Sequence, residues 1–252
     1  MTFFKAEDLA IRFGGIRAVD GVSFEVRQGE VFTIIGPNGA GKTTIFNLIS
    51  RIYEPSQGRL LFRDRDITRV APHRIAGLGI ARTFQNIELF EHATVLANLL
   101  LGRHAHRATH PLQEILFLPR VRRSELGHRE KVEDIIDFLN LQKYRDTLVM
   151  SLPFGVRKVV ELGRALAIEP ALLLLDEPSS GLSVEETDDM AFWIQDIRKL
   201  RRVTVLMVEH DMRLVSEVSD RVIALNYGQV IAEGSPDEVQ RHPEVVKAYL
   251  GG

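Results

Sequence analysis

The sequence predicts an α/β fold with a mainly parallel sheet, an N-terminal antiparallel β subdomain and an inserted helical subdomain. Nearly continuous apolar runs at 171–175 and 203–208 are typical of strands covered on both faces. A helical pattern at 184–200 lies between them, and Ser183 and Glu186 have capping-box spacing at its start. A strand, a helix and a second strand in this order form the unit from which parallel sheets are built.

The residues before this strand-helix-strand unit predict antiparallel strands and a helical insert. Residues 4–32 form short alternating runs separated by Gly14-Gly15, Asp20-Gly21 and Gln28-Gly29, which predicts small antiparallel strands joined by turns. Residues 59–62 predict one more strand. From about 89 to 155 we expect a helical insert, because apolar residues repeat there at helical spacing: Val132, Ile135, Ile136 and Leu139.

The C-terminal part predicts a hairpin and a helical tail. Residues 222–225 and 229–232 are apolar and flank Asn226-Tyr227-Gly228. Ser235-Pro236-Asp237-Glu238 is a helix-start signature, so we expect a tail of helix from about 235 to 252. With no internal repeat, residues 1–252 are expected to form a single domain.

Composition excludes several classes of protein. A chain of 252 residues with 45% hydrophobic content can bury a full core. Its 32 basic and 34 acidic residues give a net charge of -2, so nucleic acid is not an expected partner. Cysteine is absent from the sequence, which excludes disulfides and thiolate metal sites. We find neither a secretory signal nor an apolar stretch of bilayer length, so we expect a soluble cytoplasmic chain that reaches a membrane only through a partner.

The most informative segment is Gly-Pro-Asn-Gly-Ala-Gly-Lys-Thr at 36–43, between the apolar run 31–35 and a helix-like stretch at 44–49. Its glycines let backbone N–H groups approach a polyphosphate, and the following helix directs its positive end toward the same place. Lys42 is expected to reach the β and γ oxygens and Thr43 to bind Mg²⁺. The pattern predicts a phosphate-loop NTPase core that binds a nucleoside triphosphate through this set: Gly36, Pro37, Asn38, Gly39, Ala40, Gly41, Lys42, Thr43 and Thr44.

Acidic residues follow the predicted strand at 171–175. We expect Asp176 to anchor Mg²⁺ and Glu177 to orient and deprotonate the attacking water. His210 follows the next strand and is expected at the same edge of the sheet, beside the γ-phosphate. Glu177, His210 and Lys42 are therefore the predicted catalytic residues.

With these residues in place, the chain resembles the ATP-binding subunits of ABC transporters from about Leu9 to Leu250. Residues 83–86 (Thr-Phe-Gln-Asn) match the glutamine loop of that family, 180–183 its D-loop, His210 its switch histidine and 152–157 its signature segment. The resemblance implies a head-to-tail dimer that holds each ATP between two subunits. It implies that Gln85 contacts nucleotide and Mg²⁺, and that Gly155 contacts nucleotide. Phe13 looks like the aromatic residue that stacks on adenine, although a core phenylalanine is the alternative.

The closer resemblance is to the subset that serves branched-chain amino acid and related importers. It rests on residues 12–15, 81–86, 89–90, 94–99 and the terminal Tyr249-Leu250-Gly251. It implies membrane-spanning permease subunits and a second ATP-binding subunit, identical or different, as partners, and a solute-binding protein as an indirect one. The chain is then expected to be peripheral on the inner face of the cell membrane. A soluble ABC-type regulatory ATPase is the main alternative, and a phosphate-loop kinase of small metabolites is another.

The signature segment departs from the usual Leu-Ser-Gly-Gly-Gln. Pro153, Phe154 and Val156 replace the serine, the first glycine and the glutamine. Because Pro153 has neither a hydroxyl nor an N–H, one or two hydrogen bonds to phosphate should be missing. We expect weaker closure around ATP, slower turnover, or pairing with a subunit whose signature is intact.

Overall fold

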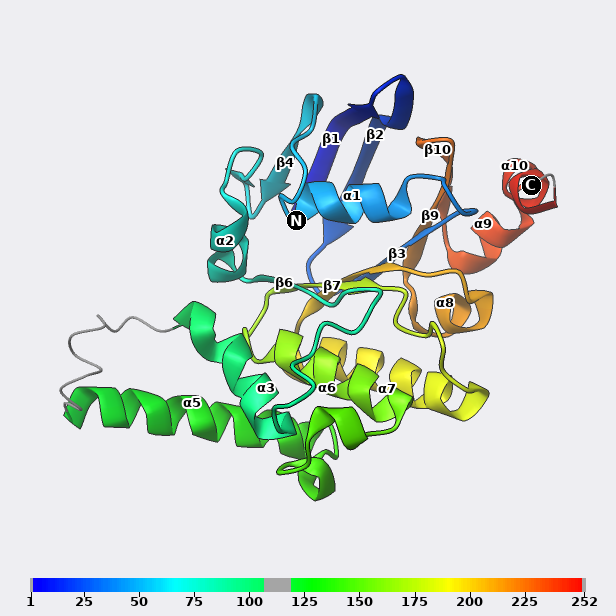
Figure 1. Ribbon diagram of the computed structural model, residues 1–252. Helices are drawn as coiled ribbons and strands as arrows, with labels where there is room; N and C mark the ends of the chain where they lie inside the picture. The colour runs from blue at the N-terminus through cyan, green and yellow to red at the C-terminus, as the bar shows by residue number, and fades with distance from the viewer. Residues whose placement is uncertain (1, 107–118, 251–252) are drawn as a thin grey trace. The chain divides into compact units, whose positions relative to one another are not determined.

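The computed structural model describes residues 2–106 and 119–250, which form two compact units (Figure 1). The first unit combines Met1–Gln85 with Ala171–Gly252, and the second is Asn86–Pro170. Residues 107–118 of the expected insert and Gly251 of the terminal motif lie outside the described residues.

The first unit contains a six-stranded sheet in the order β10-β9-β3-β8-β7-β6. Its strands are parallel except β10, which pairs antiparallel with β9 in the predicted hairpin. The residues of β3, β7 and β8 are all buried, which explains their apolar sequences. The predicted parallel α/β core is confirmed. The strands are β3 (Val31–Ile35), β6 (Ile80–Arg82), β7 (Leu172–Asp176), β8 (Thr204–Val208), β9 (Arg221–Asn226) and β10 (Gln229–Gly234).

A second, antiparallel sheet has the order β2-β1-β4-β5. Its direction agrees with the sequence, but the prediction of small strands was wrong, because β1 and β2 each span 12 residues. Asp20-Gly21 does not end a strand. Gly21 has φ 73° and Asp8 φ 48°, and register shifts beside Asp8 absorb these turn-like residues as bulges. The strands are β1 (Thr2–Phe13), β2 (Ile16–Arg27), β4 (Gln57–Phe62) and β5 (Arg65–Asp66).

The two sheets and helix α1 share one hydrophobic core, in which the Phe24 and Phe32 rings stack 5.5 Å apart. Successive β3 residues point to opposite faces: Ile34 belongs to this core, and Ile35 packs with residues of α8, α9 and α10. The predicted capping box at Ser183 is confirmed at the start of α7. The helical elements of this unit are α1 (Lys42–Ile49), α2 (Pro72–Ile75), η1 (Ala76–Leu78), α7 (Val184–Arg201), α8 (Met212–Val218), α9 (Pro236–Arg241) and α10 (Pro243–Leu250).

The second unit is helical, as the sequence predicts. Its elements are α3 (Val95–Gly102), η2 (Arg103–His106), α5 (Pro119–Phe138), η3 (Gln142–Tyr144), η4 (Val149–Ser151) and α6 (Phe154–Leu166). The four apolar residues that predicted the long helix and its end are buried. Gly163 of α6 lies so close to Leu99, Ile135 and Leu139 that a Cβ there would touch all three side chains. Within the described part of either unit, no helix is both long and apolar enough to cross a membrane.

Candidate nucleotide-binding and hydrolysis site

The glycine-rich loop connects the end of β3 to the first turn of α1. Gly36, Gly39 and Gly41 all have positive φ, at 151°, 81° and 102°. A Cβ at Gly36 or Gly41 would come within 3.0 Å of a main-chain carbonyl oxygen, that of Leu225 or Ala18. Glycine is therefore required at these two positions both for backbone conformation and for the close approach of neighbouring strands.

Lys42 is the first residue of α1 and is only 5% exposed. Its Nζ donates to the carbonyl oxygens of Gly36 at 2.7 Å and Pro37 at 3.1 Å. Burial lowers the pKa of this ammonium, and three carboxylates oppose the shift: Glu177, Asp176 and Glu209. The loop lysine thus lies in the field of the acidic residues at the ends of β7 and β8.

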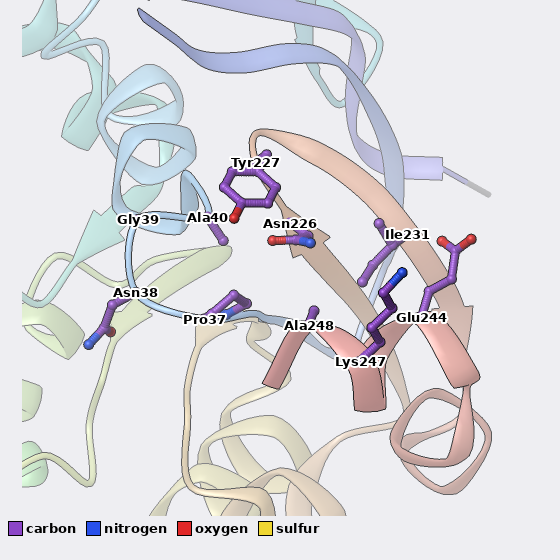
Figure 2. A pocket seen from close by; sticks show the side chains of 10 residues that line it. All are labelled: Pro37, Asn38, Gly39, Ala40, Asn226, Tyr227, Ile231, Glu244, Lys247 and Ala248. Atoms are coloured by element: carbon purple, nitrogen blue, oxygen red, sulfur yellow. The ribbon is translucent and has the colours of Figure 1, made fainter. Parts of the chain in front are cut away.

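The other loop residues differ in exposure. Asn38, Gly39 and Thr43 are exposed, Pro37 and Thr44 are half-buried, and Ala40 is buried. Figure 2 shows residues 37–40 along one side of a pocket of about 560 Å³, with the hairpin of β9 and β10 and the helix α10 on its other sides.

Asp176 is the last residue of β7, and its side chain is 1% exposed. One oxygen, Oδ2, accepts from Nη2 of Arg82 at 2.7 Å. The Asp176 main-chain N–H donates to the Thr83 hydroxyl at 3.4 Å. Asp176 is therefore held through its carboxylate by Arg82 of the neighbouring strand β6, and through its main chain by Thr83, which follows that strand.

Glu177 comes next and has φ 48°. Its main-chain N–H donates to the carbonyl oxygen of Val208 at 2.9 Å, which ties the turn to β8. Its carboxylate accepts from Nε2 of Gln85 at 2.9 Å and lies 3.7 Å from Nδ1 of His210. The structure thus brings together three residues that the sequence assigned separately.

A buried carboxylate that was not assigned a role in the sequence supports His210. Glu209 is fully buried, accepts from the Ser179 hydroxyl and accepts from the His210 main-chain N–H at 3.2 Å. Burial raises the pKa of Glu209, against the opposing hydrogen bond from Ser179. Its only signal in the sequence is a glutamate directly before the histidine.

One cleft of about 660 Å³ joins these groups and is lined by Gly36, Pro37, Asn38, Gln85, Glu177, His210, Ala248 and Tyr249. Tyr249 of α10 is a site residue that the sequence indicated only as part of a terminal motif. Burial raises the pKa of its phenol, and a backbone hydrogen bond with Gly36 opposes that shift.

Several predicted residues are not among those that line the cleft, and two of them, Phe13 and Gly155, also lie outside the phosphate loop and the acidic ends of β7 and β8. Phe13 ends β1, is 44% exposed and packs edge-on against the Tyr53 ring at 5.1 Å, a partner that the sequence did not indicate. Gly155 is buried in the first turn of α6, in the second unit. Their predicted contacts with nucleotide stay predictions.

The residues present fit a magnesium nucleotide. The loop holds its main chain open because its glycines lack Cβ atoms, and Lys42 places a cation beside it. Thr43 and Asp176 offer a hydroxyl and a carboxylate, the oxygen donors that Mg²⁺ prefers when phosphate completes its shell. Among the described residues, no group of three or more acidic, histidine or cysteine side chains is arranged to hold a metal by itself.

Fold and cleft together define a phosphate-loop protein that binds and hydrolyses nucleotide. Residues 19–180 match the family model described as ABC transporter, and residues 229–252 match that of the branched-chain amino acid ATP-binding cassette transporter. The chain belongs to the ABC transporter ATP-binding family and is an ATP-hydrolysing cassette.

The matches to relatives and to solved structures extend over at least 96% of the chain. The high-affinity branched-chain amino acid transport ATP-binding protein BraF of Pseudomonas aeruginosa is 40% identical over 243 residues, 96% of this chain and 95% of BraF. LivG of Escherichia coli strain K12 is 36% identical, with the same coverage of both chains. An ABC transporter cassette solved in its ADP conformation superposes with a TM-score of 0.87 at 33% identity and 100% coverage of both chains. A nucleotide-free cassette gives 0.85 at 32% identity, again with 100% coverage of both.

Proposed function

We propose that this chain is the ATP-hydrolysing subunit of a membrane importer for branched-chain amino acids or related small solutes. The observation that carries the hydrolytic part is the convergence of Gln85, Glu177 and His210 in one cleft with the phosphate loop. The names of the relatives support the transport part, and they favour it over a soluble regulatory ATPase.

Each residue has a role in this proposal. The main-chain N–H groups of the loop and Lys42 bind the phosphates, and Phe13 stacks on adenine. Thr43, Asp176 and Gln85 would hold Mg²⁺, which would supply positive charge against the phosphates. Glu177 accepts a proton from the attacking water, and His210 contacts the γ-phosphate. Glu209 acts through His210, whose main chain it holds.

The assembly follows from the same proposal. Two ATP-binding subunits pair head to tail, and the signature segment around Gly155 of one completes the phosphate site of the other. Permease subunits anchor the pair on the cytoplasmic face of the membrane and transmit its closure, and a solute-binding protein delivers the solute to them. The Gln85 loop is the proposed link between Glu177 and the permease.

Glu177→Gln tests the proposal, with the exposed Glu185→Gln on α7 as matched control. Losing the base should slow ATP hydrolysis by about 10²- to 10⁴-fold without preventing nucleotide binding. In gel filtration with ATP, the ATP-binding subunit carrying Glu177→Gln should elute as a dimer. The subunit carrying Glu185→Gln should no longer elute as a dimer once it has consumed the ATP. Unchanged hydrolysis in Glu177→Gln would contradict the assignment.

A further inference from the structure

Arg82 is a buried cation beside the proposed magnesium carboxylate. It ends β6, three residues before Gln85, and its side chain is only 8% exposed. Its Nη2 donates to Oδ2 of Asp176 at 2.7 Å. Residues 81–86 were singled out in the sequence, yet the proposed function uses only Gln85 from that segment.

The other end of the guanidinium is fixed to the helix that follows the phosphate loop. Nη1 donates to Oδ1 of Asn47 on α1 at 2.8 Å and to the hydroxyl of Ser50, the C-cap residue of α1, at 3.1 Å. The guanidinium carbon lies 5.5 Å from the Phe46 ring centroid and 5.2 Å from that of Phe84. A planar group with several donors suits this place, since it bonds a carboxylate and a helix while packing against two rings.

This geometry has an electrostatic consequence for any divalent cation at Asp176. The guanidinium occupies one carboxylate oxygen and adds a positive charge on the protein side of the group. A cation bound by the same carboxylate is repelled by that charge, with little screening because both partners are buried.

We propose that Arg82 is a positioning residue that orients Asp176 for Mg²⁺ and, by sharing that carboxylate, limits how tightly the cation binds. This role rests on the proposed magnesium site. It also connects the metal carboxylate to both the phosphate-loop helix and the glutamine loop through one side chain.

The direction in which metal affinity changes on substitution of Arg82 separates this role from a merely structural one. A variant that only loosens the site would bind metal more weakly. Removing the competing charge while a hydrogen bond to Asp176 is kept should instead tighten metal binding and slow hydrolysis. Arg82→Gln makes that change, and Arg82→Lys keeps the charge but cannot bond Asp176 and α1 together.

The metal affinity of the full chain is measured by electron paramagnetic resonance, with Mn²⁺ as the probe and saturating ADP. We expect Arg82→Gln to bind Mn²⁺ at least about tenfold more tightly than the unchanged protein. Arg82→Lys should stay within about threefold of the unchanged affinity, with a lower kcat and a similar KM for ATP. Arg221→Gln is the matched control, because Arg221, the first residue of β9, also pairs with a buried carboxylate, that of Glu30, and lies over the Phe32 ring. The Mn²⁺ affinity of Arg221→Gln should equal that of the unchanged protein.

Weaker or unchanged Mn²⁺ binding in Arg82→Gln would overturn the role of Arg82 and leave the proposed function intact. A large change in Arg82→Lys would also overturn it, and this result remains available if Arg82→Gln does not fold. If the unchanged protein binds no Mn²⁺ with ADP, the proposed metal site itself is wrong, and the role of Arg82 is overturned with it.

Discussion

Gly41 offers the sharpest test of how the phosphate loop is built. It has φ 102°, and a Cβ there would come within 3.0 Å of the Ala18 carbonyl oxygen on β2. Gly39 lies in the same loop with φ 81°, and nothing lies within 4 Å of the place its Cβ would take. Gly41→Ala and Gly39→Ala therefore differ mainly in main-chain crowding.

The magnitudes follow from that difference. Both alanines would be held in a left-handed conformation, at about 1–2 kcal/mol each. Gly41→Ala must in addition displace main chain, and overpacking of this kind typically costs about 1–3 kcal/mol. We expect the free energy of unfolding to fall by about 2–5 kcal/mol for Gly41→Ala and by about 1–2 kcal/mol for Gly39→Ala.

Urea denaturation measures both values, with the fluorescence of Trp193 as the probe, because this is the one tryptophan in the sequence and its side chain is nearly buried in α7. Titration with a fluorescent ADP analogue gives nucleotide affinity, which should fall most in Gly41→Ala because the start of α1 is displaced. Equal destabilisation by the two substitutions would refute the reasoning that the loop is held against β2 by a main-chain contact.

Three further predictions concern binding, turnover and stability. Pro153→Ser places a hydroxyl at the N-cap of α6 and should raise the ATPase rate of the assembled transporter about tenfold or more, since each recovered bond to phosphate is worth about 1.5–3 kcal/mol; an unchanged rate would remove the hypothesis. Phe13→Ala should weaken ATP binding by about 1–3 kcal/mol in calorimetry and Phe13→Trp should not, whereas equal affinities would identify Phe13 as a packing residue. Hydrogen bonds from Lys131 and Arg103 lower the pKa of Glu169 from 4.5 to about 2. Because its side chain is 44% exposed, the solvent-screened gain is only about 1 kcal/mol, present above pH 4.5 and lost as the pH falls toward 2. Glu169→Gln should remove this pH-dependent part of the free energy of unfolding, and an unchanged pH profile would contradict it.

The parts that the sequence predicted are those whose signals are local. The phosphate loop carries its glycines, lysine and threonine in one contiguous segment, and β7 and β8 show their burial as unbroken apolar runs. The capping box at Ser183 is likewise complete within four residues. In contrast, Asp20-Gly21 was misread because a bulge and a turn use the same residues, and only the partner strand distinguishes them.

The parts that could not be predicted depend on partners far apart in the chain. Arg82 and Asp176 are 94 residues apart, and Ser179 and Glu209 are 30 apart. No periodicity links such pairs, because they meet only where the strand order places β6 beside β7 and β7 beside β8. Tyr249 and Gly36 are likewise far apart in the chain, and they meet because α10 packs against the end of β3.

These long-range pairs explain how the acidic side of the cleft keeps its shape. Three carboxylates, those of Asp176, Glu177 and Glu209, gather at the ends of two adjacent strands, where their mutual repulsion favours separation. Each is held by a different neighbour: Arg82 bonds the first, Gln85 the second and the Ser179 hydroxyl the third. Because a charged donor, an amide and a hydroxyl stabilise an anion to different degrees, the three carboxylates are not equivalent. The one bonded by Arg82 is buried at the end of β7, whereas the one bonded by Gln85 lines the cleft beside His210.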